Sequence, residues 1–233
     1  MTKNPPEKET IQPLFDAIAP VYDFLNHFLS FGIDTYWRNQ IISTLLLTPN
    51  DIILDAACGT GALSHRLLKK YSHVPFSLTG VDFSEKMIDH AMKTIHDKRA
   101  TFIQGDVETL PFEELTFHHV MIAFGVRNLE NLSKGLHEMY RVLKKEGTIH
   151  ILEFSVPPNG LWRRLFHFYF HKILPPLGKW ISGHSHAYTY LPKSVEHFLP
   201  LKEFTALLTN TGFHSVTIHA MTGGVCTLYV AQK

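Results

Sequence analysis

Apolar runs and amphipathic stretches alternate along the middle of the chain. Five runs rich in branched or aromatic side chains have the length and composition of buried strands. These predicted strands are 51–56, 76–82, 100–104, 117–124 and 148–154. Between them, apolar residues recur at helical spacing, which predicts helices over 61–71, 84–95 and 130–143. Strands that alternate with helices predict an α/β fold, in which a parallel sheet carries helices on both faces.

The C-terminal part of the chain extends this sheet. A helix is expected over 201–211. Two further strands, 213–220 and 225–231, follow it and are joined at Gly223-Gly224, which predicts an antiparallel hairpin. The complete sheet therefore has seven strands, mostly parallel, in a single domain that spans residues 1–233.

The N-terminal part precedes the first strand. Residues 1–10 are polar and are expected to be a loose tail. Helical spacing is present over 14–31, with a break at Pro20, and again over 37–46. We expect residues 1–48 to form a helical cap over the edge of the sheet, and plain surface packing is the alternative.

The first strand ends in a glycine-rich turn. Residues 52–61 read Ile-Ile-Leu-Asp-Ala-Ala-Cys-Gly-Thr-Gly. Gly59 and Gly61 lack a Cβ atom, so the chain can turn tightly and a flat ligand can approach the backbone. The helix that begins near Gly61 directs free N–H groups at the same place. Asp55 contributes a negative charge at the strand tip, which suits a ligand that carries positive charge.

Aspartates follow three successive predicted strands. Asp55 and Asp82 end the first two strands, and Asp106 comes just after the third. In open parallel sheets, ligands bind beyond the carboxyl ends of the strands. Asp82 lies about 20 residues after Gly61, the distance at which an acid can accept from ribose hydroxyls. Asp106 could accept from a purine amine. Each aspartate alone could be an ordinary cap or turn residue, but together they predict a site for an adenosine-bearing ligand.

Two ligands compete for this site. A dinucleotide site needs a third glycine or an alanine, and Ser64 occupies that position. Asp55 would also repel a pyrophosphate. S-adenosylmethionine has a sulfonium, an ammonium and no phosphate, so it fits Asp55 and Asp82 better. The sequence favours S-adenosylmethionine as the cofactor.

Composition excludes several other classes of protein. The net charge of +1 argues against a nucleic-acid-binding protein, which usually has a strong basic excess. Two cysteines, Cys58 and Cys226, are too few for a disulfide framework and favour the cytoplasm. The N-terminus has no apolar signal core. No apolar stretch reaches the roughly 20 residues needed to span a bilayer.

Several motifs together carry a resemblance to a known family. The chain resembles, nearly end to end, the bacterial demethylmenaquinone and 2-polyprenyl-6-methoxybenzoquinol C-methyltransferases. The glycine-rich turn is common to many methyltransferases, whereas the other motifs are more specific to this family. These motifs are Phe15-Asp16-x-Ile18-Ala19-x-x-Tyr22-Asp23-x-x-Asn26, Ser30-Phe31-Gly32, Trp37-Arg38, Phe124-Gly125-Val126-Arg127-Asn128, Glu153-Phe154-Ser155, Tyr188-x-Tyr190-Leu191 with Ser194, and Thr222-Gly223-Gly224-Val225.

The resemblance implies a Rossmann-like class I methyltransferase fold and several ligand contacts. It implies that Thr60, Asp82 and the pair Asp106-Val107 contact the methyl donor. Ala123 departs from the family, in which a serine commonly precedes the Phe-Gly pair. The hydrogen bond that such a serine could make to the donor is therefore not expected in this chain.

The chemistry of ring methylation predicts roles for three further residues. A quinol carbon becomes nucleophilic when the adjacent phenol is deprotonated or strongly hydrogen-bonded. Arg127 could stabilise the developing phenolate, while Asn128 and Tyr22 orient the ring, and a water or a histidine takes the proton. For Arg127 the alternative is a surface ion pair with Glu130.

The stretch 156–198 differs in composition from the rest of the chain. It contains no Asp or Glu before Glu196, but it has five Lys or Arg residues and many aromatic residues. We expect it to form an insertion over the acceptor pocket that contacts anionic lipid and collects a prenyl tail. The alternatives are a buried insertion helix or the face of a homodimer. His167 and His171 have no carboxylate or cysteine nearby in the sequence, so no metal site is expected.

These observations combine into one functional expectation. We expect S-adenosylmethionine-dependent C-methylation of a prenylated quinol, demethylmenaquinol to menaquinol on the resemblance. The expected location is the cytoplasm, with peripheral contact at the membrane. Methylation of the ubiquinone-precursor benzoquinol is the first alternative. A nucleotide-dependent oxidoreductase and a non-catalytic quinone- or lipid-binding protein are the others.

Overall fold

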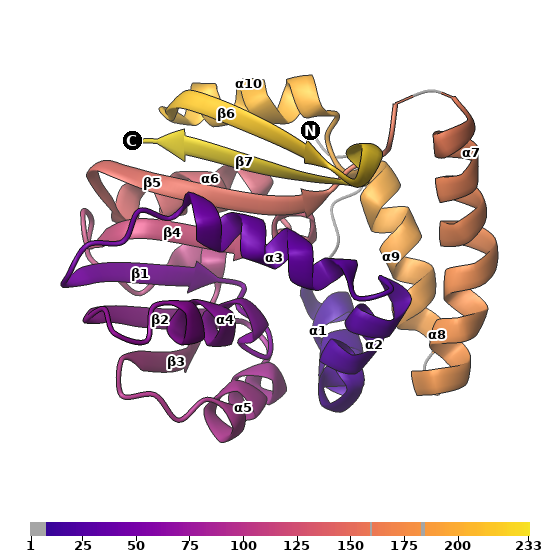
Figure 1. Ribbon diagram of the computed structural model, residues 1–233, viewed down its shortest axis with the longest axis horizontal. Coiled ribbons are helices and arrows are strands. Elements are labelled where there is room, and N and C mark those ends of the chain that lie inside the picture. Colours follow the sequence, from indigo (N-terminus) through magenta and orange to yellow (C-terminus); the bar gives the residue numbers. More distant parts are fainter. Residues whose placement is uncertain (1–7, 159, 183–184) are drawn as a thin grey trace.

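The computed structural model describes residues 8–158, 160–182 and 185–233. Seven strands form one sheet in the order β3-β2-β1-β4-β5-β7-β6 (Figure 1). The strands are β1 (Asp51–Ala56), β2 (Phe76–Asp82), β3 (Ala100–Gln104), β4 (Phe117–Ala123), β5 (Leu143–Phe154), β6 (His214–Met221) and β7 (Cys226–Gln232). Neighbouring strands among β1 to β5 are parallel, and β7 is antiparallel to both β5 and β6. The predicted fold class is confirmed.

Helices cover both faces of the sheet, as the alternating pattern predicts. On one face, residues such as Trp37, Leu67 and Ile88 form a buried apolar cluster with the sheet. On the other face, Met139 and Phe204 belong to a second cluster. The helices of the first face are α3 (Ile33–Thr44), α4 (Ala62–Lys70) and α5 (Glu85–Thr94), and those of the second are α6 (Leu132–Val142) and α10 (Leu201–Thr211) (Figure 1).

Polar caps mark the start of two of these helices. The Ser84 side chain accepts a hydrogen bond from Met87 N at 3.2 Å and is the N-cap of α5. In α6, the Asn131 side chain accepts from Lys134 N at 3.0 Å. This cap makes the helix begin at Leu132, two residues after the predicted start.

The segment directly after α6 belongs to a strand, which begins earlier than the predicted range 148–154. β5 begins at Leu143, and the pairing of Phe117 with Leu143 is followed by a register shift. A Cβ atom on Gly147 would lie 2.8 Å from the backbone oxygen of Lys144 and 2.9 Å from that of His118. Glycine is therefore needed here because two strands approach closely at a bulge.

The N-terminal helices begin earlier than predicted. α1 (Lys8–Ile18) includes residues 8–10, so the expected tail is wrong over those three residues, while residues 1–7 lie outside the described part. A 3-10 turn, Ala19–Val21, separates α1 from α2 (Tyr22–Leu29), which confirms the break predicted at Pro20. α3 begins at Ile33, directly after Gly32, whose φ of +78° suits glycine.

A second helical group stands beyond the carboxyl ends of the parallel strands, next to α1 and α2 (Figure 1). It consists of α7 (Leu161–Phe168), a π-helical turn (Tyr169–Ile173), α8 (Leu174–Ser182) and α9 (Ser185–His197). None of the helices in the described part of the chain combines the length and hydropathy needed to cross a bilayer.

Candidate active site

The glycine-rich turn after β1 forms one wall of a cavity at the carboxyl edge of the sheet. Gly59 and Gly61 have φ values of +55° and +79°, which other residues rarely adopt. A Cβ atom on Gly59 would meet nothing within 4 Å, so the backbone there faces open space. A Cβ atom on Gly61 would instead lie 2.6 Å from the Ile95 side chain. Gly61 is therefore needed because Ile95 packs closely against the turn.

Eight of the predicted site residues line this cavity, which we call the acidic cavity. They come from the N-terminal helices, from the tips of β1 and β2, and from the segments that follow β3 and β4. The residues are Tyr22, Asp55, Gly59, Thr60, Asp82, Asp106, Val107 and Asn128. Gly61 and Arg127 do not line it. The fold therefore brings together most of the set that the aspartates at the strand ends, the family resemblance and the chemistry of ring methylation predicted.

Asp55 and Asp82 are buried at adjacent strand tips. Asp55 accepts a hydrogen bond from the Ser64 hydroxyl at 2.5 Å. Asp82 accepts from Gly59 N at 2.8 Å and from Ser84 N at 3.0 Å. In the sequence, Ser64 served only as evidence against a dinucleotide ligand. In the structure it is the hydrogen-bond donor to Asp55. Asp106 accepts from Glu108 N at 2.9 Å and caps the short turn Val107–Thr109.

Burial makes both acids hard to ionise. It raises the pKa of Asp55 to about 7, and the charge of Asp82 contributes to this shift. Burial likewise raises the pKa of Asp82 to about 6, although backbone N–H groups at Ser84 and Gly59 oppose it. Two carboxylates held in a low-dielectric cavity are stabilised by a cation between or beside them. The cavity is therefore suited to a positively charged ligand.

The N-terminal helices reach into the same cavity. Asp23 of α2 accepts from the Thr60 hydroxyl at 2.8 Å. Asp16 of α1 accepts from the Ser84 hydroxyl at 2.5 Å. No function was predicted for either acid from the sequence. Only their place in the N-terminal motif pointed to them. These two hydrogen bonds fasten α1 and α2 over the carboxyl ends of β1 and β2.

A second cavity of about 340 Å³ lies beside the first, and we call it the aromatic cavity. Its volume is in the range of small-molecule sites. Apolar and aromatic side chains from α3, β5 and the α7 segment form most of its wall. Among them are Trp37, Phe154, Trp162, Phe166, Tyr169 and Phe170.

The two cavities share four lining residues: Phe15, Tyr22, Arg38 and Phe124. Arg38 is buried, donates to Asp34 at 2.6 Å, and lies over the Phe124 ring at 5.3 Å. Sequence analysis named Arg38 only as part of a motif. A ligand in the acidic cavity and a ligand in the aromatic cavity would therefore meet beside these four side chains.

Arg127 lines the aromatic cavity and is buried. Its guanidinium donates to the Glu153 carboxylate at 2.8 Å and to the backbone oxygen of Phe124, and Nε donates to Ser194 at 3.2 Å. Burial lowers the pKa of Arg127, but the Glu153 charge, the neighbouring Tyr190 and Tyr22, and the hydrogen bond to Glu153 together leave this pKa above the usual value. The alternative of a surface pair with Glu130 was wrong.

Two tyrosines complete the wall near Arg127. The Tyr190 hydroxyl of α9 donates to the Asn128 side chain at 2.9 Å. Burial raises the pKa of Tyr22, while Arg127 lowers it in part. Burial also raises the pKa of Tyr190. Both phenols are therefore neutral near pH 7. The Tyr190 proton is engaged by Asn128, so of the two only Tyr22 can donate a hydrogen bond to a ligand oxygen.

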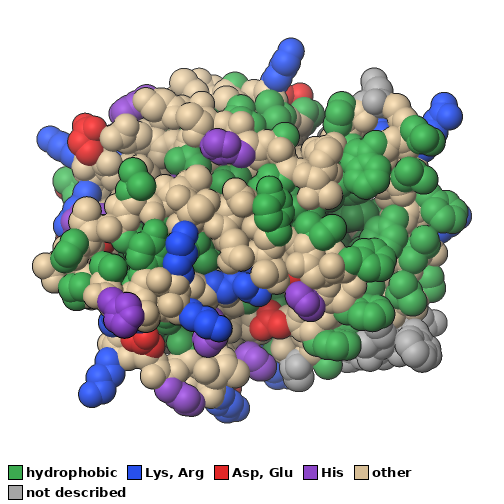
Figure 2. Space-filling view, viewed as in Figure 1, with side chains coloured by type: hydrophobic (Ala, Val, Ile, Leu, Met, Phe, Trp, Pro, Cys, Tyr) green, Lys and Arg blue, Asp and Glu red, His purple; other side chains and the backbone are tan. Residues whose placement is uncertain are grey.

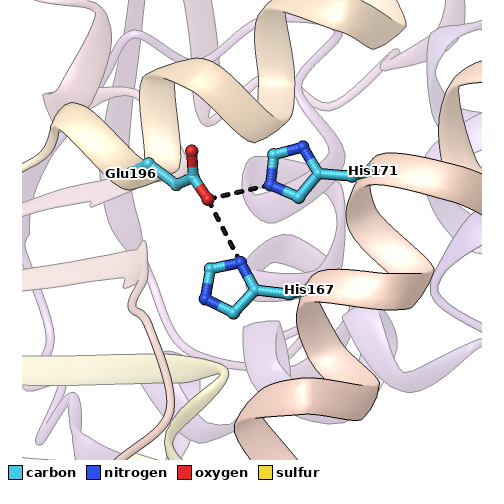
Figure 3. A group of neighbouring side chains, drawn as sticks. All are labelled: His167, His171 and Glu196. Atoms are coloured by element: carbon cyan, nitrogen blue, oxygen red, sulfur yellow. Dashed lines mark hydrogen bonds and ion pairs between the residues drawn. The ribbon is translucent and has the colours of Figure 1, made fainter.

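One expectation from the sequence is corrected by the structure. His167 and His171 were expected to have no carboxylate nearby, but Glu196 of α9 reaches both rings (Figure 3). The carboxylate comes from a separate helix, so sequence spacing gave no signal of it.

Known proteins with similar sequences share a methyltransferase name. The model of the ubiE/COQ5 methyltransferase family matches residues 2–233. Over 229 residues, the chain is 42% identical to the ubiquinone/menaquinone biosynthesis C-methyltransferase UbiE of Geotalea daltonii, with 97% of each chain covered. Over 231 residues, it is 39% identical to the demethylmenaquinone methyltransferase of Chlorobaculum tepidum, which covers 97% of this chain and 93% of that one.

Solved structures agree on the fold. A SAM-dependent methyltransferase from Aquifex aeolicus has a TM-score of 0.61 at 18% identity and covers 84% of this chain and 88% of its own. The [4+2]-cyclase SpnF has a TM-score of 0.73 at 12% identity and covers 100% of this chain and 98% of its own. The fold alone therefore accommodates different reactions.

Taken together, the sheet order and the acidic cavity define a class I methyltransferase, the class in which S-adenosylmethionine is the methyl donor. The chain belongs to the ubiE/COQ5 methyltransferase family.

Proposed function

We propose that this protein binds S-adenosylmethionine in the acidic cavity and methylates a ring carbon of a prenylated quinol held in the aromatic cavity. Demethylmenaquinol is the favoured substrate and menaquinol the product. The names of the relatives from Geotalea daltonii and Chlorobaculum tepidum support a quinone substrate. The single observation that carries the proposal is the contact between the two cavities beside Tyr22 and Phe124.

The residues of the acidic cavity fit the donor. Asp55 and Asp82 are buried acids that a cationic ligand would help to ionise. The backbone at Gly59 faces open space, so a ligand can lie directly against it. Thr60 and Asp106 supply oxygen atoms at the edge of the same cavity. The bound donor would supply an electrophilic methyl group on a sulfonium.

The aromatic cavity fits a reduced quinone ring with an apolar tail. Flat rings such as Trp37 and Phe154 can pack against the quinol. Arg127 and the neutral phenol of Tyr22 also line this cavity, and hydrogen bonds from them to a quinol oxygen would stabilise the phenolate, whose ring carbon is the stronger nucleophile. The ring carbon would take the methyl group as the methyl–sulfur bond breaks, so that the donor leaves as a neutral thioether and the proton on the ring carbon is released.

Glu153 sets the electrostatic character of this step. Its carboxylate neutralises much of the Arg127 charge before any substrate is present. Arg127 would therefore act as an oriented hydrogen-bond donor that is fixed in place, rather than as a free positive charge. Fixed donors need no reorganisation when charge develops on a substrate oxygen. Asn128, which lines the acidic cavity and is held by Tyr190 of the aromatic cavity, would orient the ring where the two cavities meet.

The rim of the aromatic cavity suits a lipid surface. Phe31, Trp162 and Leu165 line the cavity and are also 78%, 46% and 50% exposed. Hydrophobic side chains gather on the end of the molecule that carries α7 (Figure 2). Exposed Arg163 and Arg164 lie beside them on α7. Apolar side chains flanked by basic ones are typical of peripheral membrane contact, and residues 156–198 would deliver a prenyl tail to the cavity.

The decisive experiment supplies the purified chain with methyl-labelled S-adenosylmethionine and either reduced demethylmenaquinone or the reduced ubiquinone-precursor benzoquinone. We expect label in the naphthoquinol, with a mass increase of one methyl group on the ring. Label only in the benzoquinol would show that the ubiquinone-precursor benzoquinol, and not demethylmenaquinol, is the substrate. If neither quinol is labelled while the donor binds, the quinol assignment is wrong. A parallel titration with NADH tests the oxidoreductase alternative.

A further inference from the structure

A cluster of three potential metal ligands lies on the outer side of the helices that line the aromatic cavity. His167 is in the last turn of α7, and His171 is one turn later in the π-helical segment Tyr169–Ile173. Their rings are stacked, with centroids 5.7 Å apart and an interplanar angle of 8°. Glu196 of α9 points at both rings (Figure 3).

The distances in this cluster suit a small metal ion. One carboxylate oxygen of Glu196 lies 3.2 Å from His167 Nδ1 and 2.8 Å from His171 Nε2. The three ligand atoms all lie within 4.8 Å of one another. Around a tetrahedral zinc ion with bonds of about 2.0–2.1 Å, neighbouring ligand atoms are about 3.3 Å apart. The distance from Glu196 to His167 already fits this value, and the distance from Glu196 to His171 would lengthen by roughly half an ångström.

We propose that His167, His171 and Glu196 form a binding site for a divalent transition-metal ion, with Zn²⁺ as the representative ion. Two imidazoles and one carboxylate are ligands that such ions prefer, and they leave the fourth position to water. The three side chains are 34%, 38% and 36% exposed, so an ion can reach them from solvent. The site is separate from both cavities and does not depend on the proposed reaction.

The neighbouring charge gives the proposal a specific consequence. Arg163 Nε lies 3.4 Å from His167 Nε2, on the far side of the ring from Glu196. When Nδ1 binds a metal, the ring proton moves to Nε2, and the contact with Arg163 becomes unfavourable. Arg163 also adds a positive charge close to the ion. Replacing Arg163 with glutamine should therefore strengthen metal binding.

A bound ion would join two walls of the aromatic cavity. Phe166 and Phe170 lie next to the two histidines in the chain and line that cavity. On α9, Tyr190 and Leu191 also line it, and Glu196 lies little more than one turn further along. An ion held by both helices would cross-link them and stabilise the folded chain, because a ligand that binds only the native state raises its stability.

The test uses the full chain without a polyhistidine tag, stripped of metal by a chelator. Titration with Co²⁺ is followed by visible absorption, which strengthens when the ion has four ligands rather than six, and Zn²⁺ competition gives the affinity by calorimetry. We expect one ion per chain, a higher melting temperature with Zn²⁺, and weaker binding at acidic pH because the histidines must be neutral. Mg²⁺ should give none of these effects.

Variants of single residues test whether Zn²⁺ binds at this cluster or at other side chains. His171→Ala and Glu196→Gln should each weaken Zn²⁺ binding by at least about tenfold, the loss that even an outer partner causes at metal sites. Arg163→Gln should strengthen binding. His137→Ala removes an exposed histidine on α6 that bonds to a backbone oxygen, and it should change nothing. Absence of saturable binding, or equal binding in His171→Ala and the parent chain, would show that the cluster is a hydrogen-bonded group only.

Discussion

The guanidinium of Arg127 and the carboxylate of Glu153 form an ion pair, 2.8 Å apart, in which the two side chains are 5% and 0% exposed. The pair joins the segment after β4 to the tip of β5, directly beside the aromatic cavity. Glu153 also accepts from the backbone N–H of Arg127 at 3.1 Å and from that of Phe154 at 2.8 Å. The carboxylate thus fixes both the charge and the backbone of the residue proposed to act on the substrate.

Removing the charge of Glu153 should destabilise the protein strongly. Glu153→Gln leaves the Arg127 guanidinium buried without a counter-charge, which typically costs about 3–5 kcal/mol. Chemical denaturation would measure this loss in the free energy of unfolding. The matched change Glu146→Gln removes an exposed acid and should stay within about 0.5 kcal/mol. Equal stability of the two variants would contradict the assigned role of the pair.

Truncation of Arg127 should affect turnover more than donor binding. Arg127→Ala removes a donor proposed to stabilise charge on the quinol oxygen, and loss of one such donor typically lowers kcat by about 10²–10³-fold. Arg127 does not line the acidic cavity, so the Kd for S-adenosylmethionine should change little. Calorimetry and single-turnover assays would measure the two quantities. Collapse of donor binding with normal turnover of the bound complex would refute this role.

Donor affinity should rise as the pH increases through about 6 to 7. The pKa of Asp82 lies at about 6 and that of Asp55 at about 7, so both acids lose their protons in this range and can then attract a cation. Calorimetric titration with S-adenosylmethionine between pH 5 and pH 8 would follow the change. Asp55→Asn should weaken binding at pH 8 and remove the upper part of the pH dependence. An affinity independent of pH would show that neither carboxylate must ionise for binding.

The unliganded protein should show the opposite trend in stability. A carboxyl group whose pKa is raised by folding binds its proton more tightly in the native state, so its contribution to stability falls as the pH rises from about 4 to about 7. Asp55→Asn should reduce this slope, which denaturation without donor would reveal. An unchanged slope would mean that Asp55 titrates at its ordinary pKa.

Substitution of two glycines should have different effects, one on donor binding and the other on the stability of the fold. Gly59→Ala places a methyl group in the open space of the acidic cavity, at a left-handed backbone position that costs about 1–2 kcal/mol for other residues. We expect it to weaken donor binding at least tenfold while the chain still folds. Gly80→Ala instead drives a methyl group into the Phe102 ring and should lower stability at a place that does not line the cavity. Comparable donor affinity in both variants would contradict the proposed position of the donor.

A charge on the apolar rim should abolish the proposed membrane contact. Phe168 is 58% exposed and does not line the aromatic cavity, so Phe168→Glu changes the rim without changing the cavity. We expect weaker co-sedimentation with anionic vesicles and unchanged donor affinity. Leu46 is 82% exposed near the amino end of β1, and Leu46→Glu is the matched control. Equal vesicle binding by both variants would remove α7 from the membrane face.

Local patterns predicted those parts of the structure that depend on short segments. The strands, the cap at Ser84 and the glycine-rich turn are determined by residues close to one another in the sequence. The positions of Asp55, Asp82 and Asp106 followed from a general rule, since parallel strands end at the same edge. The contact roles of these acids with a donor remain predictions.

Contacts between side chains that are far apart in the sequence could not be predicted from local patterns. Glu130 is three residues from Arg127, but the strand order places Glu153, 26 residues away, against the guanidinium. For the same reason, the contact of Asp16 with Ser84 after β2 and that of Asp23 with Thr60 after β1 were not predicted. It also hid Glu196 beside the two histidines, because the packing of two helices decides that contact.

The position of β7 between β5 and β6 has a consequence for synthesis of the chain. β6 is made before β7 but pairs with no strand other than β7 among the described residues, so it cannot join the sheet until β7 has left the ribosome. Thr222 and Val225, in the hairpin between these strands, line the aromatic cavity. A nascent chain therefore cannot complete the wall of the aromatic cavity before residues Cys226–Gln232 have been synthesised.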